Sequence, residues 1–130
     1  MATNTAGTTA RELATQQIHY IRKQITETSA LTGTIGIVPA GSIFLAPISG
    51  VAVNVVFSGT NPTVDIGITG TTQKYASALD LDAALGFVPF DVAVSQKVTV
   101  DTTLIYTLVL DTPTTADGDA EIVIAYVPNI

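Results

Sequence analysis

The sequence predicts an all-β fold: an antiparallel β-sandwich or jelly-roll-like body with a short N-terminal helix or extended arm. Hydrophobic residues alternate with other residues in several short runs, and this period of two is typical of strands that bury one face. Glycine, proline, asparagine and aspartate separate the runs, as they do in turns. About eight short strands at this spacing favour two packed antiparallel sheets.

The first 30 residues differ in texture from the remainder. We expect an N-terminal arm with a short helix over residues 1–30 and a β-sandwich body over residues 31–130. Thr9 and Glu12 have the spacing of a capping box, which starts a helix that we expect to end near Thr26. Four apolar residues form one stripe on such a helix: Ala14, Ile18, Ile21 and Ile25. Either the stripe docks on the chain's own sheet or on a neighbour, or it forms a short helical bundle on a symmetry axis.

Residues 50–68 show the alternation most clearly. Hydrophobic residues occupy every second position of residues 51–57, a Ser-Gly-Thr-Asn-Pro break follows, and the period resumes in residues 64–68. The segment predicts a strand, a loop and a second strand, and we expect the strand over residues 50–57 to lie centrally. Residues 104–110 and 122–126 predict further strands by the same pattern.

Residues 75–85 are the one part of the body that predicts a helix. Tyr75, Leu79 and Ala83 are four residues apart, and Gly86 is a suitable stop. Acidic and hydroxyl side chains weaken so short a helix, so a loop is the alternative.

Composition excludes several classes of protein. The absence of cysteine removes thiolate catalysis, Cys-ligated zinc and disulfides together. Eleven acidic and five basic residues give a net charge of -6, and this acidity argues against nucleic-acid binding, which needs clustered Lys and Arg. Only 12% of the residues are charged, against about a quarter in typical domains. Thr-rich strand faces toward solvent and apolar patches toward neighbours fit this composition, which favours an oligomer or a subunit of a larger assembly.

Neither a signal peptide nor a membrane helix is expected. The N-terminus has no apolar run after a basic region, and no stretch approaches the ~20 apolar residues of a membrane span. We therefore expect the protein to be made in a cytosol and to be used there or in particles assembled there.

Carboxylates are the only candidates for reactive or metal-binding chemistry. Two acidic segments resemble fragments of calcium loops: Asp80-Leu81-Asp82, and Asp117-Gly118-Asp119 with Glu121. We interpret them as turn or cap residues, with a bound cation as the alternative. His19 is the single histidine, and no cysteine is present to form a metal site with it. No nucleophile elbow, phosphate loop or His-containing triad is present, so we expect no enzymatic activity, no cofactor and no metal.

Several stretches together resemble the small decoration, or cement, proteins that bind the outside of the capsid of tailed bacteriophages. They are the Thr/Ala-rich leader, residues 43–45 before residues 51–57, residues 64–67 followed by residues 75–81, and the closing residues 118–126. The resemblance spans most of residues 31–127.

The resemblance implies a β-rich, often trimeric body that sits between capsomers on the virion surface and clamps them against internal pressure. The implied partners are the major capsid protein and further copies of this chain in a homotrimer, with no nucleic acid and no membrane. The leader is the segment that can form the fewest contacts within its own domain, so we expect it to bind neighbouring proteins. The candidate partner-binding residues are Thr9, Arg11, Leu13, Ile18, Tyr20, Ile21, Arg22 and Ile25.

Two other functions stay open at this point. One is a phage fibre or spike head or another glycan-binding module, which predicts affinity for sugars. The other is a tail-tube or neck subunit, which predicts rings or tubes instead of a discrete trimer.

Overall fold

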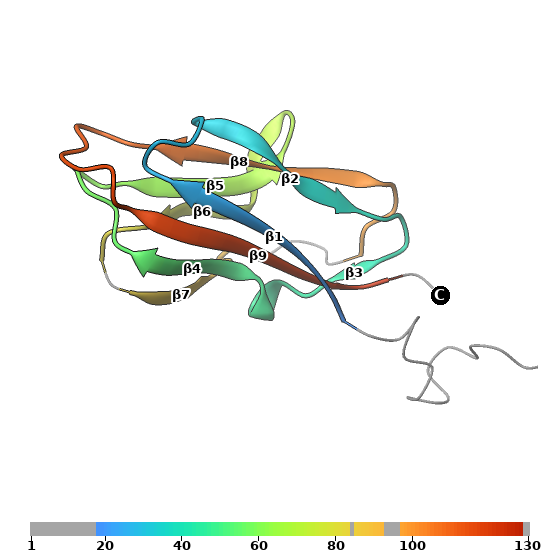
Figure 1. Ribbon diagram of the computed structural model, residues 1–130. Helices are drawn as coiled ribbons and strands as arrows, with labels where there is room; N and C mark the ends of the chain where they lie inside the picture. The colour runs from blue at the N-terminus through green and yellow to red at the C-terminus, as the bar shows by residue number, and fades with distance from the viewer. Residues whose placement is uncertain (1–17, 84, 93–96, 129–130) are drawn as a thin grey trace, which may run out of the picture.

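The computed structural model describes residues 18–83, 85–92 and 97–128. Within these ranges, nine β-strands form two antiparallel sheets that pack face to face, and one short 3-10 helix lies between two of the strands (Figure 1). The predicted all-β sandwich is therefore confirmed.

Sheet A is built around β9, its longest strand. Its elements are β1 (His19–Thr26), β3 (Ile43–Phe44), β4 (Gly50–Val55), β7 (Gly86–Pro89) and β9 (Asp119–Val127), with the 3-10 helix η1 (Ala46–Ile48) between β3 and β4. The strand order is β1-β9-β4-β7, and β3 pairs with β9 beyond the end of β4. β1 pairs with β9 from Thr26 opposite Asp119 to His19 opposite Tyr126.

Sheet B covers the other side of the core. Its strands are β2 (Thr32–Val38), β5 (Thr63–Ile68), β6 (Thr71–Asp80) and β8 (Thr102–Val109). The order is β2-β8-β5-β6, with all pairs antiparallel. Consecutive strands β4 and β5 thus lie in different sheets, each between two partners, and the place of β4 between β9 and β7 confirms the central position predicted for residues 50–57.

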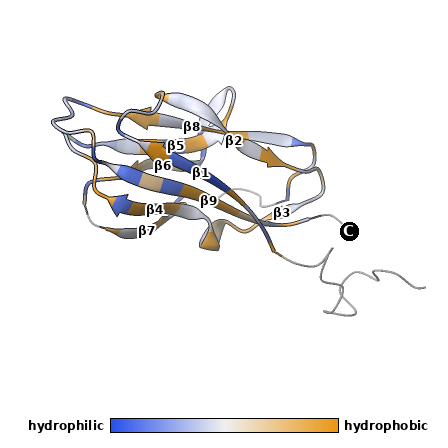
Figure 2. Ribbon diagram, in the orientation of Figure 1, coloured by the Kyte–Doolittle hydropathy of each residue, from blue (hydrophilic) through white to orange (hydrophobic). Residues whose placement is uncertain are grey.

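The core lies between the sheets and takes every second residue of the strands. In β9, Ala120, Ile122 and Ile124 are fully buried, whereas Glu121 and Val123 between them are partly exposed. Figure 2 shows the same alternation of hydrophobic and hydrophilic residues along other strands. Burial of these apolar side chains is the main driving force for packing the two sheets.

One side of the sandwich is closed by the segment that follows β7. The Phe90 N–H donates to the Ser49 carbonyl beside sheet A (3.0 Å), and the Val92 N–H donates to the Tyr75 carbonyl of sheet B (3.3 Å). The Phe44 ring packs against the rings of Tyr75 and Phe90, with centroids 4.7 Å and 5.7 Å apart. The segment therefore crosses from one sheet to the other over an aromatic cluster.

The helix predicted to end near Thr26 is wrong over His19–Thr26, because these residues form β1. Burial alternates along the strand: Ile25 is fully buried and Ile21 packs against the core, while Tyr20, Arg22 and Gln24 are exposed. Pairing with β9 along the whole strand satisfies the backbone in place of a helix. This segment belongs to the sandwich and not to an arm. The remainder of the predicted helix and arm, residues 1–17, lies outside the described residues.

The helix predicted for residues 75–85 is also wrong. Residues as far as Asp80 form β6, and the described residues that follow are bends. Ala78 has a φ of 51°, and its N–H donates to the Asp65 carboxylate at 2.7 Å. The register with β5 shifts at this bulge. Because the bulge inserts an extra residue, Ala76 and Leu79 are both buried although they are three positions apart.

Candidate interaction surface

The two sheets present different outer faces. On sheet B, the exposed side of β2 and β8 is rich in threonine, with Thr32 opposite Thr107 and Ile37 opposite Thr103. Hydroxyl groups therefore separate the exposed hydrophobic side chains of this face. Among the described residues, the outer face of sheet A differs because its centre carries hydrophobic side chains without threonine between them.

Register across sheet A brings these hydrophobic residues together. Gly50 lies opposite Val123 on one side and Pro89 on the other, and Ala52 lies opposite Phe87. A Cβ at Gly50 would lie 2.7 Å from the Phe87 ring, so the glycine lets this ring approach β4 closely. We call this surface, together with the exposed Ile48 of η1, which adjoins β7 and β9, the apolar face; its residues are Tyr20, Ile48, Ala52, Phe87, Pro89 and Val123.

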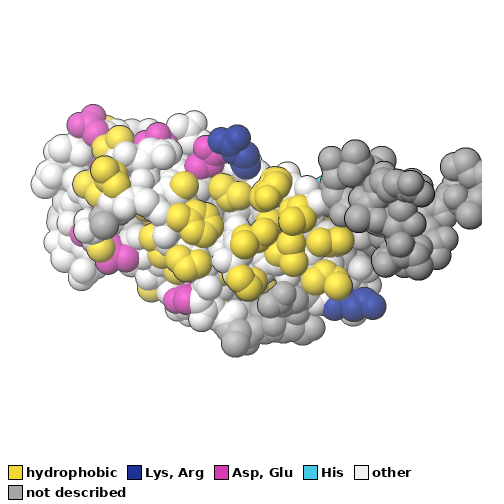
Figure 3. Space-filling view, turned by 90° about the horizontal axis from the view of Figure 1, so that it is seen from below, with side chains coloured by type: hydrophobic (Ala, Val, Ile, Leu, Met, Phe, Trp, Pro, Cys, Tyr) yellow, Lys and Arg dark blue, Asp and Glu magenta, His cyan; other side chains and the backbone are white. Residues whose placement is uncertain are grey.

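The apolar face is well exposed. Tyr20 is 58% exposed, Phe87 48% and Ile48 46%. Figure 3 views the molecule from the side of β4 and β7 and shows hydrophobic side chains gathered over this sheet, with most charged groups toward its edges. Single exposed hydrophobic residues are ordinary on protein surfaces, but a contiguous set on one face is typical of an interaction site.

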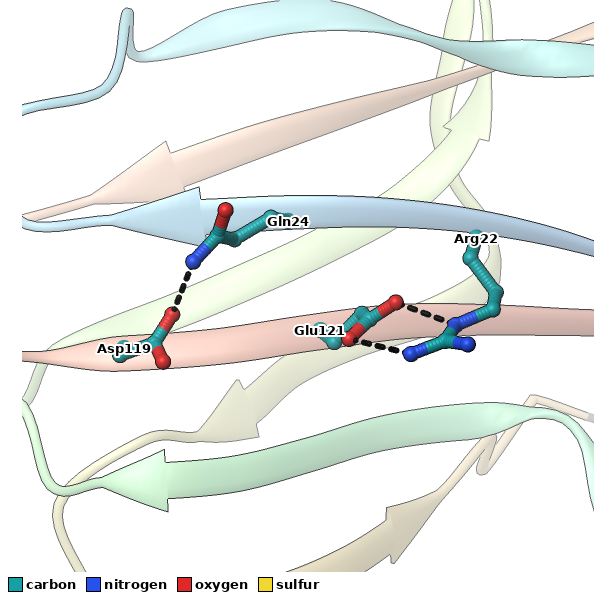
Figure 4. Close-up of polar contacts among 4 residues, drawn as sticks. All are labelled: Arg22, Gln24, Asp119 and Glu121. Atoms are coloured by element: carbon teal, nitrogen blue, oxygen red, sulfur yellow. Dashed lines mark hydrogen bonds and ion pairs between the residues drawn. The ribbon is translucent and has the colours of Figure 1, made fainter.

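Polar pairs between β1 and β9 border the apolar face (Figure 4). Arg22 forms a bidentate ion pair with Glu121, through Nε to Oε1 and through Nη2 to Oε2 at 2.9 Å. Gln24 Nε2 donates to Asp119 Oδ1 at 2.9 Å. Hydrogen bonding by Arg22 lowers the pKa of Glu121 and raises the pKa of Arg22 itself. The charge of Arg22 at this border is thus neutralised within the chain.

The structure divides the predicted partner-binding residues. Tyr20 lies on the apolar face, Arg22 lies at its border, and Ile18 is exposed just before β1. Ile25 and Ile21 are different: Ile25 has no exposed surface, and Ile21 packs against the core, where its Cγ2 would lie 2.7 Å from a Cβ at Gly36. Surface binding by Ile25 is therefore a wrong prediction, because this side chain fills the sandwich interior, whereas Ile21 is only partly buried and its role in binding stays a prediction. Thr9, Arg11 and Leu13 lie outside the described residues.

Sequence reasoning missed most of the apolar face. It named Tyr20 but not Ile48, Ala52, Phe87 or Val123. A usable signal was present at position 52, between the inward-facing Val51 and Val53. A strand that faces solvent has a polar residue at such a position, whereas this strand has Ala52.

The acidic segments that resemble calcium loops are occupied by contacts within the chain. Asp80 Oδ1 accepts from the N–H groups of Asp82 (2.9 Å) and Ala83 (3.1 Å). Hydrogen bonding within this turn lowers the pKa of Asp80, and the hydrogen bond to Asp80 raises the pKa of Asp82. In the described part of the chain, no group of three or more His, Cys, Asp or Glu side chains is placed to hold a metal ion. Its helical content likewise includes nothing long and apolar enough to cross a membrane.

The geometry defines the protein as a two-sheet β-sandwich that has one apolar outer face. No family model matches the sequence, and no curated protein matches it. In fold, the chain is similar to a chain of the cyanophage Pam1 capsid asymmetric unit, with a TM-score of 0.63 and 20% sequence identity. The alignment covers 87% of this chain and 86% of that chain, so the two chains are about the same length.

Proposed function

We propose that the chain is a structural virion protein that binds the outer surface of a phage capsid between capsomers and stabilises the shell. The observation that carries this proposal is the fold shared with a chain of a capsid asymmetric unit, over most of both chains and at similar length. The resemblance of the sequence to decoration proteins points in the same direction.

The contrast between the two outer faces supports this role. A protein that coats a particle needs one face for the particle and one for water. The threonine-rich face of sheet B suits water, and the apolar face of sheet A suits a neighbouring protein. The proposed partners are the major capsid protein and further copies of the chain in a homotrimer.

Stabilisation follows from binding alone, without chemistry. A ligand that binds the assembled shell and not its separated subunits stabilises the shell by mass action. Many identical sites on each particle multiply a modest contact energy. No catalytic group, cofactor or metal is required, in line with our proposal that the chain is not an enzyme.

The test uses the full chain and capsids of the phage that encodes it, prepared without this protein. Cryo-electron microscopy should show the added chain at repeated positions on the outer surface, and the temperature at which the particles release DNA should rise. Unassembled major capsid protein is the control and should bind far less. Localisation at a tail tip would support the fibre alternative, and rings or tubes of the isolated chain would support the tail-tube alternative; either result overturns the proposal.

A further inference from the structure

We infer that the apolar face is the surface that seats on the capsid shell, against an uncharged and largely apolar protein surface. This inference rests on the proposed function and deepens it by naming the contact surface and the chemistry of its partner.

The fold does not need the side chains of the apolar face. The core between the sheets is complete without them, since β9 buries Ala120, Ile122 and Ile124 on its inner side. Tyr20 and Phe87 instead point to the outer side of the same sheet, where they are half-exposed. A contiguous hydrophobic surface that contributes nothing to the core is explained by a partner that covers it.

The charges at the apolar face decide which class of partner it fits. Arg22, the basic residue at the border, is already paired with Glu121, and the six residues of the apolar face are uncharged. A nucleic acid or an anionic lipid surface requires clustered cations, which this face does not offer in the described residues. An uncharged protein surface is the complementary partner.

Charge also favours the shell over a second copy of the chain as the partner of the apolar face. Each chain has a net charge of -6, and Asp119 and Glu121 lie at the border of the face. Two copies joined through their apolar faces would bring the Asp119 carboxylates at the two borders toward each other, which is unfavourable.

The outer side of sheet A is smaller than the surface that a stable complex buries on each partner. Four strands at ~4.8 Å spacing and about eight residues at ~3.3 Å give a face of roughly 500 Å² in projection. Stable protein complexes bury about 800 Å² on each partner, so this face needs a further contact. Seventeen residues precede Ile18, and β1 begins at the next residue, His19. Fully extended, they would reach up to ~60 Å. A partner that continues beyond the face, as a shell lattice does, can meet both the face and this segment.

The experiment compares two pairs of substitutions in the full chain. Phe87→Ser with Ile48→Ser alters the apolar face, and Ile37→Ser with Val109→Ser is the matched control on the outer side of sheet B, where Ile37 and Val109 are 56% and 48% exposed. Binding to capsids prepared without this protein should fall at least about tenfold for the first pair and change less than about twofold for the control. Thermal unfolding of both variants should show the same cooperative transition as the wild type, which establishes that they are folded.

Equal binding by the apolar-face variant and the wild type, or equal loss in both variants, overturns the inference. Failure of the wild-type chain to bind capsids overturns the proposed function instead, so the two failures are distinguishable. A photo-reactive phenylalanine analogue at position 87, with the same analogue at position 37 as control, provides a second readout that does not weaken the face. Crosslinks from position 87 to the capsid protein support the inference, and crosslinks mainly to another copy of this chain overturn it.

Discussion

The carboxylate of Glu27 accepts hydrogen bonds from both the backbone N–H and the hydroxyl of Ser58, at 2.6 Å and 2.8 Å. Glu27 is buried and also accepts from the Gly118 N–H at 3.2 Å. The Ser58 hydroxyl oxygen in turn accepts from the N–H groups of Thr114 and Thr115, both at 3.0 Å. One buried carboxylate and one hydroxyl therefore join the turn after β1, the loop after β4 and the loop before β9.

Removal of this carboxylate should destabilise the fold. Glu27→Ala leaves the N–H groups of Ser58 and Gly118 without their acceptor, and a buried unsatisfied donor costs about 1–3 kcal/mol. Urea denaturation should show a lower free energy of unfolding by about that amount. Asp117→Ala, at an exposed position of the same loop, is the control and should change stability much less. Equal effects of the two substitutions would contradict this role for Glu27.

Gly67 should tolerate alanine poorly for a steric reason. A Cβ at this position would lie 2.6 Å from the Thr72 carbonyl oxygen, which belongs to the backbone of the paired strand and has little room to move. Gly67→Ala should therefore lower the midpoint of urea denaturation by more than Gly70→Ala. Gly70 has a φ of 88° but no atom within 4 Å of the added Cβ, so alanine there meets only backbone strain of about 1–2 kcal/mol. A smaller effect at Gly67 would show that the hairpin can open to accept the methyl group.

Acid should weaken the fold partly through Glu121. Its pKa is lower in the folded protein than its ordinary value of 4.5, chiefly because Arg22 donates hydrogen bonds to it. The pair therefore contributes stability above that value and loses the contribution as the pH falls through the lowered pKa. Glu121→Gln should unfold with a shallower dependence on pH between about 5 and 3 than the wild type, measured by urea denaturation at each pH. Arg22→Gln should behave alike, since either change removes the pair. An unchanged slope in both variants would remove this ion pair from the account of acid sensitivity.

Truncation should distinguish β1 from the residues before it. Deletion of residues 1–27 removes β1, the buried Ile25 and the Glu27 carboxylate, and it leaves β9 without a partner along one edge. We expect this variant to lose cooperative thermal unfolding and to aggregate, because an exposed strand edge pairs with other chains. Deletion of residues 1–17 keeps β1 and should retain a cooperative transition. A cooperative transition in the longer deletion would mean that sheet A does not depend on β1.

Period-two patterns predicted β4, β5, β8 and β9, whose inward positions are mostly apolar. Residues 50–57 and 64–68 match β4 and β5 because valine and isoleucine fill nearly every inward position. β1 was missed because half-buried His19 and Lys23 share its inner side with Ile21 and Ile25, so the apolar residues alone have a helical spacing. β6 was missed because the bulge at Ala78 breaks the alternation. That bulge is held by Asp65, on a different strand.

The sequence by itself determined that this chain is a β-sandwich with threonine-rich and apolar strand faces, since alternation and composition are local properties. Only the tertiary structure decided where those faces lie. Phe87, Ala52 and Val123 come from β7, β4 and β9, and pairing across sheet A places them side by side. Alternation tells which side chains of one strand share a side, but it carries no information about which strands are neighbours. Long-range pairing and burial of the common core select those neighbours, so the apolar face exists only in the folded protein.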